Sequence, residues 1–397
     1  MKWFQESGRL GLGTVAIVLG AGWLGCSSED SAAKSTAPSG TAADGGATSS
    51  TPGPTPPATP GPTVPSPTTP PGNPSGACTT PAGGGPEDVS HPTTVVGNGT
   101  AASCTSAAVV AAVAKAGVVT FDCGSAPITI EVPEMRLFND AGSAKNGDLT
   151  IDGGGKVTLS GGGKNRILYQ NACEEALHWT TSHCNNQEHP KLVLQNLALA
   201  NGRSTATSSV LGGGAVYVQG GQLKLVNTTF VGNVVETLGS DYAGGAVYAV
   251  QMFAPVLVSN STFGAVGSGN QAASGGALGS IGVTWTIVNS RFEGNAATGT
   301  GQSSGQGGNG GAIYNDGNTY TLSLCGTEIT QNKANELGGA IFYVSNNLTG
   351  SMLLDHVTSK TNVTGKDVQG ALHKGIYAEV TDKAGKTGIT ITSSTIE

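Results

Sequence analysis

The chain has 397 residues, of which 11% are charged, and its formal net charge at neutral pH is −7. This mild acidity, without a cluster of lysine and arginine, argues against nucleic acid and against an anionic membrane surface as partners. The 63 glycine residues are typical of closely stacked turns, and the roughly 310 residues left after leader and linker are enough to bury a core.

Residues 1–25 have the pattern of a secretory signal peptide. Lys2 and Arg9 lie in a short polar start, and an apolar, glycine-rich run extends from Leu10 to Gly25. This run is too short for a comfortable membrane-spanning helix and is typical of the apolar region of a signal peptide. We therefore expect the protein to be exported.

Cys26 follows this run directly. Residues Trp23-Leu24-Gly25-Cys26 resemble the bacterial lipobox, although Trp23 departs from the usual leucine; an ordinary signal peptide with a chance cysteine is the alternative. The resemblance implies lipidation at Cys26 and a membrane partner reached through that lipid anchor. Ser27 after the cysteine resembles lipoproteins sent to an outer membrane, so the implied location is the bacterial cell envelope, at the outer membrane or cell surface.

Residues 26–86 consist mainly of serine, threonine, alanine, proline and glycine, with few charges and few bulky apolar side chains. Such a composition cannot bury a core and predicts a disordered tether. About sixty residues of flexible coil would span roughly 45 Å.

Residues 87–147 contain the one helical pattern of the chain, Ser106 to Ala116, followed by an apolar strand that Cys123 ends. Cys104 opens the helix, so a Cys104–Cys123 disulfide would pin the helix across the first strands as a cap. A cap is expected because an uncovered end of a stacked β-structure exposes strand edges and core. Export makes disulfides plausible.

An insertion at residues 173–189 holds three of the six histidines of the chain. Cys173 and Cys184 are predicted to pair, which makes the insertion a stapled surface loop. Its histidines are spaced five and six residues apart, which matches no familiar ligand pattern, so no metal site is predicted. The alternative is a contact loop formed by His178, Trp179, His183 and His189, with the tryptophan as an amphipathic anchor. Cys325 is expected to be a buried thiol, and Cys78 has no predicted partner.

A Gly-Gly-Ala motif followed by an aliphatic residue occurs five times between Gly213 and Phe342. Its second glycines stand at positions 214, 245, 276, 311 and 339, and a weaker sixth copy is Gly370-Ala371-Leu372-His373. Steps of about 30 residues mean stacked supersecondary units, each of which buries the face of its neighbour.

A second motif, asparagine followed three residues later by phenylalanine, accompanies the first. It begins at Asn227, Asn260 and Asn289, and apolar residues alternate with polar ones just before each copy. Period two predicts strands with one buried face, and the units are too short for propeller blades. One coil of a parallel β-helix per unit fits, with asparagines at left-handed corners. The aliphatic residue after each Gly-Gly-Ala should point inward, as should a stack of Phe230, Phe263, Phe292 and Ile329.

The paired motifs resemble the repeats of the polymorphic outer-membrane-protein class within the pectate-lyase-like superfamily. The resemblance covers residues 148–397 and implies an all-β, right-handed parallel β-helix, a solenoid with the N-terminal helical cap described above. It does not imply an activity, because this superfamily includes lyases, hydrolases, esterases and adhesins, and fold does not fix function.

The residue after each inward aliphatic falls on the outer face of its sheet by the period of two. These positions predict an exposed stripe suited to stacking on sugar rings or to a partner protein. Its members are Tyr217, Tyr248, Tyr314, Phe342 and His373. The alternative is a reversed register, in which these rings fill the core.

Catalytic chemistry has weak support in the sequence. Uronate lyases need carboxylate clusters for Ca²⁺ with a basic residue, and glycoside hydrolases need paired carboxylates, yet Glu293 is the one acid in its column. The signatures of polygalacturonases and pectate lyases are missing, so no catalytic residue and no cofactor are predicted and enzymatic activity is disfavoured. We expect a surface-displayed lipoprotein that binds a polysaccharide or another envelope protein. The alternatives are a carbohydrate-active enzyme (polysaccharide lyase or glycoside hydrolase) and a structural spacer.

Overall fold

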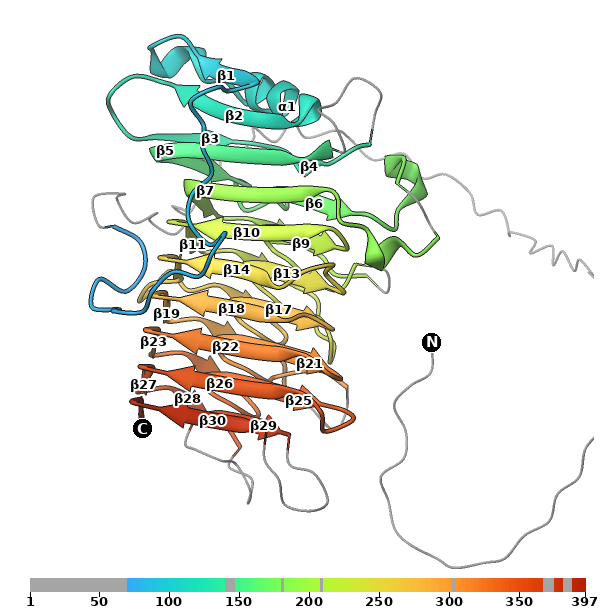
Figure 1. The fold of residues 1–397 in the computed structure, drawn as a ribbon, viewed down its shortest axis with the longest axis vertical. Helices are drawn as coiled ribbons and strands as arrows, with labels where there is room; N and C mark the ends of the chain where they lie inside the picture. Colours follow the sequence, from blue (N-terminus) through green and yellow to red (C-terminus); the bar gives the residue numbers. More distant parts are fainter. Residues whose placement is uncertain are drawn as a thin grey trace, which may run out of the picture. The chain divides into compact units, whose positions relative to one another are not determined.

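The computed structural model describes residues 70–139, 147–179, 182–207, 210–301, 305–366, 375–380 and 388–397. All of them belong to one compact unit, Ala58–Glu397. The unit is a right-handed parallel β-helix in which successive coils stack strand on strand, as Figure 1 shows. The predicted fold class is therefore confirmed. The predicted signal peptide, Cys26 and residues 26–69 of the tether lie outside the described residues.

The described strands form three parallel sheets. The Gly-Gly-Ala sheet consists of β4 (Met135–Arg136), β6 (Leu168–Asn171), β9 (Val216–Gln219), β13 (Val247–Val250), β17 (Leu278–Ile281), β21 (Ile313–Gly317), β25 (Ile341–Ser345) and β29 (Ile376–Glu379). The small sheet consists of β8 (Arg203–Ser204), β12 (Val234–Val235), β16 (Gln271–Ala272), β20 (Ala296–Ala297), β24 (Lys333–Ala334) and β28 (Val363–Thr364).

The third sheet, called the wide sheet below, supplies two strands to most coils. It consists of β1 (Thr94–Gly97), β2 (Gly117–Asp122), β3 (Ile128–Glu131), β5 (Leu149–Ser160), β7 (Lys191–Ala200), β10 (Gln222–Val226), β11 (Thr229–Val231), β14 (Val256–Ser259), β15 (Thr262–Phe263), β18 (Trp285–Val288), β19 (Arg291–Glu293), β22 (Thr321–Cys325), β23 (Glu328–Thr330), β26 (Ser351–Asp355), β27 (Thr358–Lys360), β30 (Ile389–Thr392) and β31 (Thr395–Ile396). From β10 onward, a left-handed corner residue lies between the two strands of each coil, whereas β7 passes through the corner at Asn196 as one strand.

These corners explain the asparagines of the second motif. Asn227, Asn260 and Asn289 have φ angles of 52°, 48° and 49°, in the left-handed region that asparagine tolerates better than most residues. The predicted asparagine corners are therefore confirmed. The same corner is made by Gly326 and His356 in later coils.

A ladder of buried asparagines lies inside the solenoid. Each side-chain amide donates to the Oδ1 of the next asparagine at 2.8–3.0 Å, and also to a backbone carbonyl. The ladder runs through the buried residues Asn233, Asn270, Asn295 and Asn332 and ends at Asn362, which is half-buried. Because these amides are satisfied, the ladder stabilises the stack without leaving buried polar groups unpaired.

The core follows the predicted inward positions. Val216, Val247 and the equivalent aliphatics are fully buried, and Phe230, Phe263 and Phe292 stack with ring centroids 5.1 and 4.7 Å apart. The sixth Gly-Gly-Ala copy was misplaced by sequence reasoning. Ile376 pairs with Ile341 in the Gly-Gly-Ala sheet, whereas Leu372 and His373 lie outside the described residues.

The helix α1 (Ser106–Lys115) lies against the first strands at the N-terminal end of the stack (Figure 1). Thr105 caps it by accepting a hydrogen bond from the backbone N–H of Ala108 at 3.2 Å. The buried residues Val109 and Val113 face the strands, and the predicted Cys104–Cys123 disulfide is present. Three short 3₁₀ turns complete the described helices: Ala101–Ser103, Glu175–Leu177 and Cys184–Asn186.

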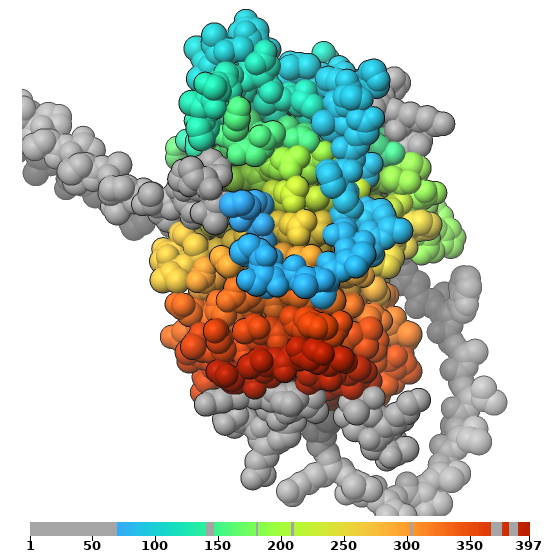
Figure 2. Space-filling view, turned by 60° about the vertical axis from the view of Figure 1, so that its left-hand side comes forward, coloured from blue at the N-terminus to red at the C-terminus, as the bar shows by residue number. Residues whose placement is uncertain are grey.

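Residues 70–92, called the strap below, lie on the outer face of the wide sheet. Figure 2 shows this blue segment spread over the coils coloured yellow and orange. The strap then leads into β1 at the cap. The predicted boundary at residue 86 is therefore wrong, since residues 70–86 bind the solenoid through the contacts described next.

Candidate functional site: the strap and its disulfide

The lower part of the strap follows the column of left-handed corners. The backbone N–H of Gly72 donates to Thr262 Oγ1 at 2.7 Å, and that of Asn73 donates to the carbonyl of Asn289 at 2.8 Å. A Cβ on Gly76 would lie 2.6 Å from Asn289 Oδ1, so glycine is required for this close approach. Gly72 and Gly76 of this low-complexity segment therefore have a specific packing role.

The upper part of the strap bonds to polar side chains of the wide sheet. Ser259 Oγ donates to the carbonyl of Gly84 at 2.7 Å. Lys224 Nζ donates to the carbonyls of Gly83 and Gly85 and pairs with Glu87. The side-chain amide of Gln195 makes two hydrogen bonds to the backbone of Glu87: Oε1 accepts from the N–H at 2.7 Å, and Nε2 donates to the carbonyl at 3.1 Å. These contacts satisfy the backbone of a segment that has no regular secondary structure.

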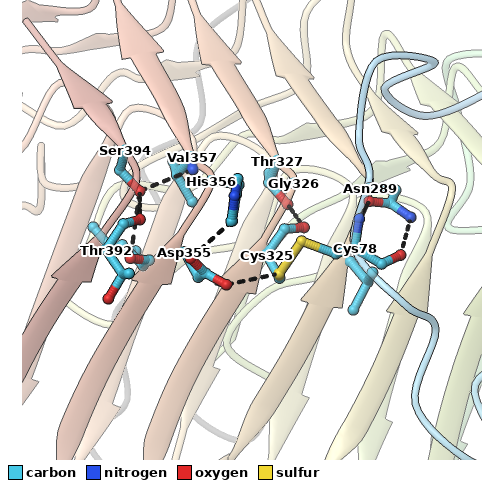
Figure 3. Close-up of a disulfide and its surroundings, with 12 residues drawn as sticks. Cys78, Asn289, Cys325, Gly326, Thr327, Asp355, His356, Val357, Thr392 and Ser394 are labelled. Carbon is cyan, nitrogen blue, oxygen red and sulfur yellow. Dashed lines mark hydrogen bonds and ion pairs between the residues drawn. A yellow bond between two sulfur atoms is a disulfide. The ribbon is translucent and has the colours of Figure 1, made fainter.

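A disulfide between Cys78 and Cys325 fixes the strap to β22, as Figure 3 shows. The side-chain amide of Asn289 makes two hydrogen bonds to the backbone of Cys78 in the same way. Its Oδ1 accepts from the N–H at 3.1 Å, and its Nδ2 donates to the carbonyl at 2.8 Å. The two cysteines are 247 residues apart in the sequence. The expected buried thiol at Cys325 is therefore wrong.

Cys325 is predicted to be a core thiol because its position is apolar in other coils, but that position is covered from outside the coil. Cys325 shares a column with Val288 on the outer face of the wide sheet, and Val288 is buried there without joining the main core cluster. Burial at this column comes from covering segments outside the coil, so an apolar pattern alone could not distinguish it from the core.

A carboxylate and an imidazole lie beside the disulfide. Asp355 Oδ2 is 3.5 Å from Cys325 Sγ, and His356 Nδ1 is 2.8 Å from Asp355 Oδ1 (Figure 3). Among the described residues, Cys78, Cys325 and Asp355 form the one group of three or more histidine, cysteine or acidic residues whose possible ligand atoms lie within 4.8 Å of one another. Metals bind the thiolate form of cysteine, so this group is not a metal site while the two sulfurs are bonded.

The proposed aromatic stripe is buried. Tyr217 is 1% and Tyr248 0% exposed, and Tyr314 and Phe342 are also buried. Their rings lie in one column that Tyr169 begins and Tyr377 ends, and they stack with centroid distances of 4.9–6.0 Å in two runs, Tyr169–Tyr217–Tyr248 and Tyr314–Phe342–Tyr377. The exposed stripe is therefore wrong, and Tyr377, not His373, occupies the last described position.

The alternative of a reversed register is also wrong. The rings of this column belong to a hydrophobic cluster separate from the main core, and they alternate with core residues such as Val216. They lie on the outer face as the period predicted, but Ala243, Leu337 and other residues from the loops of the coils cover them. Arg136 precedes Tyr169 in the column, and its guanidinium lies 4.3 Å from the centroid of the Tyr169 ring.

One position in this column lacks a ring. Gly279 lies between Tyr248 and Tyr314 in register, and a Cβ there would lie 2.4 Å from the Cβ of Ala243. The loop residue Ala243 therefore fills the gap, and it brings Asp241 to the hydroxyl of Tyr314 at 3.2 Å.

Asp241 and Asp316 form an enclosed acidic pair around that hydroxyl. Tyr314 Oη lies 3.5 Å from Asp316 Oδ2, while Asn346 donates to Asp316 Oδ1 at 2.8 Å. Burial raises the pKa of both carboxyl groups above the ordinary aspartate range, although the hydrogen bonds from Tyr314 and Asn346 oppose this. Asp316 is 9% exposed, and Asp241 is half-buried.

Of the predicted contact loop in the insertion, Trp179 is buried, His189 is half-buried, and His178 and His183 are exposed. The predicted Cys173–Cys184 disulfide of the insertion is present. Trp179 is 8% exposed, joins the hydrophobic cluster of the aromatic column and donates its Nε1–H to the carbonyl of Leu137 at 3.0 Å. The predicted anchoring role of Trp179 toward a partner is therefore wrong.

The histidines of the insertion do not converge. His189 Nδ1 contacts Asp148 Oδ1 at 2.8 Å, and His178 lies edge-on to Phe138 with centroids 6.1 Å apart. His183 occupies a left-handed backbone position. Within the described ranges, no metal-ligand group includes any of these three residues.

Searches against models of protein families, against curated proteins and against solved structures find no match to this chain. No helix of the described residues is both long and apolar enough to span a membrane. Sequence reasoning missed the strap, and the one signal that pointed to it was Cys78, an isolated cysteine at the end of a low-complexity segment.

Proposed function

We propose that this chain is a lipid-anchored protein of the bacterial cell envelope whose β-helix binds another envelope protein. The observation that most strongly supports this proposal is the way in which the strap is attached to the solenoid. The chain meets the solenoid along its side, and a disulfide across 247 residues fixes it there. This attachment through Cys78 and Cys325, called the joint below, is suited to a folded domain that is held by its N-terminal segment. The apolar leader, the lipobox-like Cys26 and the low-complexity residues 26–69 supply that segment.

A protein partner is favoured over a glycan by what the outer faces present. The aromatic rings that could stack on sugars are buried. Accessible side chains on the wide sheet instead form polar rows with paired charges, such as Arg291 Nε with Glu328 Oε2 at 3.1 Å. Mixed-charge surfaces of this kind suit a protein partner, where charge complementarity gives specificity.

The anchor is tested by substituting Cys26 with alanine. The wild-type protein should fractionate with membranes, and the Cys26→Ala protein should be released in soluble form. Ser27→Ala is the matched control, because it leaves the lipidated cysteine in place. Unchanged membrane retention of the Cys26→Ala protein would contradict the lipid anchor.

The binding role is tested with the soluble Cys26→Ala protein. We expect saturable binding to intact envelopes that is lost after the envelopes are treated with protease, and no binding on a glycan array. Glycan binding that survives protease would replace the protein partner by a polysaccharide. Release of reducing ends or unsaturated uronates from mixed polysaccharides would favour an enzyme, and no binding at all would favour a spacer.

A further inference from the structure

We propose that the Cys78–Cys325 disulfide carries tensile force from the N-terminal segment directly into β22, which only β26 and β30 of the described strands follow in its column of the wide sheet, so that the cap and the first coils bear none of it. The inference deepens the proposed tethering and rests on it. Its physical content, the route that force takes through the folded chain, is nevertheless testable on the isolated protein.

Without the disulfide, a pull on the N-terminal segment would peel the strap. The contacts of Ser259, Lys224 and Gln195 with residues 83–87 lie one after another along the strap. They would therefore be loaded one at a time, and single hydrogen bonds in contact with water contribute little each. The pull would next reach β1, which pairs with β2 alone among the described strands, and the cap would unravel.

With the disulfide, residues 79–324 form a covalently closed loop that a pull between the two ends of the chain cannot extend. Force passes from Cys78 to Cys325 and enters β22, a strand paired along its length with β18 on one side and β26 on the other. The entry point is thus an interior strand and not an end strand. The two hydrogen bonds of Asn289 hold Cys78 in place beside it.

Asp355 gives the joint a second property. Reduction requires a thiolate to attack one of the two sulfurs, and the Asp355 carboxylate lies 3.5 Å from Cys325 Sγ. Its negative charge repels an incoming thiolate and disfavours a thiolate leaving from Cys325. The joint is therefore protected against reduction by the residue next to it in the column.

The test is single-molecule pulling of the mature chain held at its N and C termini. The oxidised wild-type protein should release about 260 Å from its folded coils, because the 72 residues between Cys325 and Glu397 extend by ~3.6 Å each. The Cys78→Ser/Cys325→Ser variant should release about 780 Å more, since the other two disulfides still lock 19 and 11 residues of the 247-residue separation. Its first opening should also occur at a lower force.

Cys173→Ser/Cys184→Ser is the matched control, since it removes a disulfide that lies outside the force route. In oxidised form it should release the wild-type length at the wild-type force. If the strap variant does not fold, reducing single wild-type molecules in the instrument supplies the same comparison. A first opening of the strap variant at the wild-type force or above would overturn the inference, whatever the Cys26→Ala fractionation shows.

Discussion

Two outer faces of this solenoid are covered in different ways. The aromatic column on the Gly-Gly-Ala sheet is covered by loops of the coils themselves, such as the loop that brings Ala243 against Gly279. The wide sheet is covered from β22 to β7 by the strap, which comes from far away in the sequence and is fixed by one disulfide. We call the covering loops of the coils the local cover and the strap the remote cover. We expect that the remote cover can be removed without unfolding the coils, whereas loss of the local cover should destabilise the coils that supply it.

The largest effect should come from breaking the local cover. Tyr217→Ala should lower the free energy of unfolding by about 3–5 kcal/mol, because it leaves a cavity between two stacked rings. Thr229→Ala, on the partly exposed outer face of β11, is the control and should stay within about 0.5 kcal/mol. Denaturant titration measures both values, and a Tyr217→Ala loss as small as that of the control would mean that the column contributes little.

Removing the remote cover should cost less. Cys78→Ser/Cys325→Ser should lower the free energy of unfolding by about 2–4 kcal/mol and should make residues 70–92 sensitive to protease. Limited proteolysis with mass spectrometry locates the cuts. A strap that stays resistant in this variant would show that the hydrogen bonds of Lys224 and Gln195 hold it without the disulfide.

The acidic pair makes the local cover sensitive to pH. Because burial raises the pKa of Asp241 and Asp316, the folded protein holds protons that the unfolded chain has already lost. Their contribution to stability is therefore complete below the ordinary aspartate pKa and is lost as pH rises through the raised values. One such proton changes the free energy of unfolding by about 1.4 kcal/mol per pH unit inside that window.

Asp241→Asn should flatten that part of the pH profile. Melting temperatures recorded from pH 3 to pH 8, a range of about five units that includes the ordinary aspartate value, measure the effect. Asp88→Asn is the control, because Asp88 lies in the strap and its pKa is lowered by hydrogen bonds from Ser90. Equal profiles for the wild type and Asp241→Asn would mean that the pair stays ionised in the folded protein.

The smallest effect should be on the rate at which the disulfide that holds the strap is reduced. Asp355→Asn should speed reduction of the Cys78–Cys325 disulfide by dithiothreitol about 2- to 10-fold, since one partly exposed charge is screened by water. Quenched alkylation followed by mass spectrometry gives the rate. The Cys173–Cys184 disulfide of the same molecules is the internal control and should be unaffected.

The same contrast explains what could be predicted from the sequence. The inward position of Val216 and the stack beginning at Phe230 follow from a period of two and a regular step, both of which are local properties. Burial of Tyr248 and Cys325 depends on what covers an outer face, and periodicity does not report that. The pairing of Cys78 could not be predicted because six cysteines allow many connectivities and its partner is 247 residues away.

Hydrogen exchange of the strap tests most directly whether the disulfide holds the remote cover in place. In the oxidised protein, the backbone amides of Cys78 and Glu87 should be protected through their bonds to Asn289 and Gln195. After reduction these two amides should exchange rapidly, while the amide of Asn295 in the buried ladder stays protected. Equal protection of the strap amides before and after reduction would contradict the account.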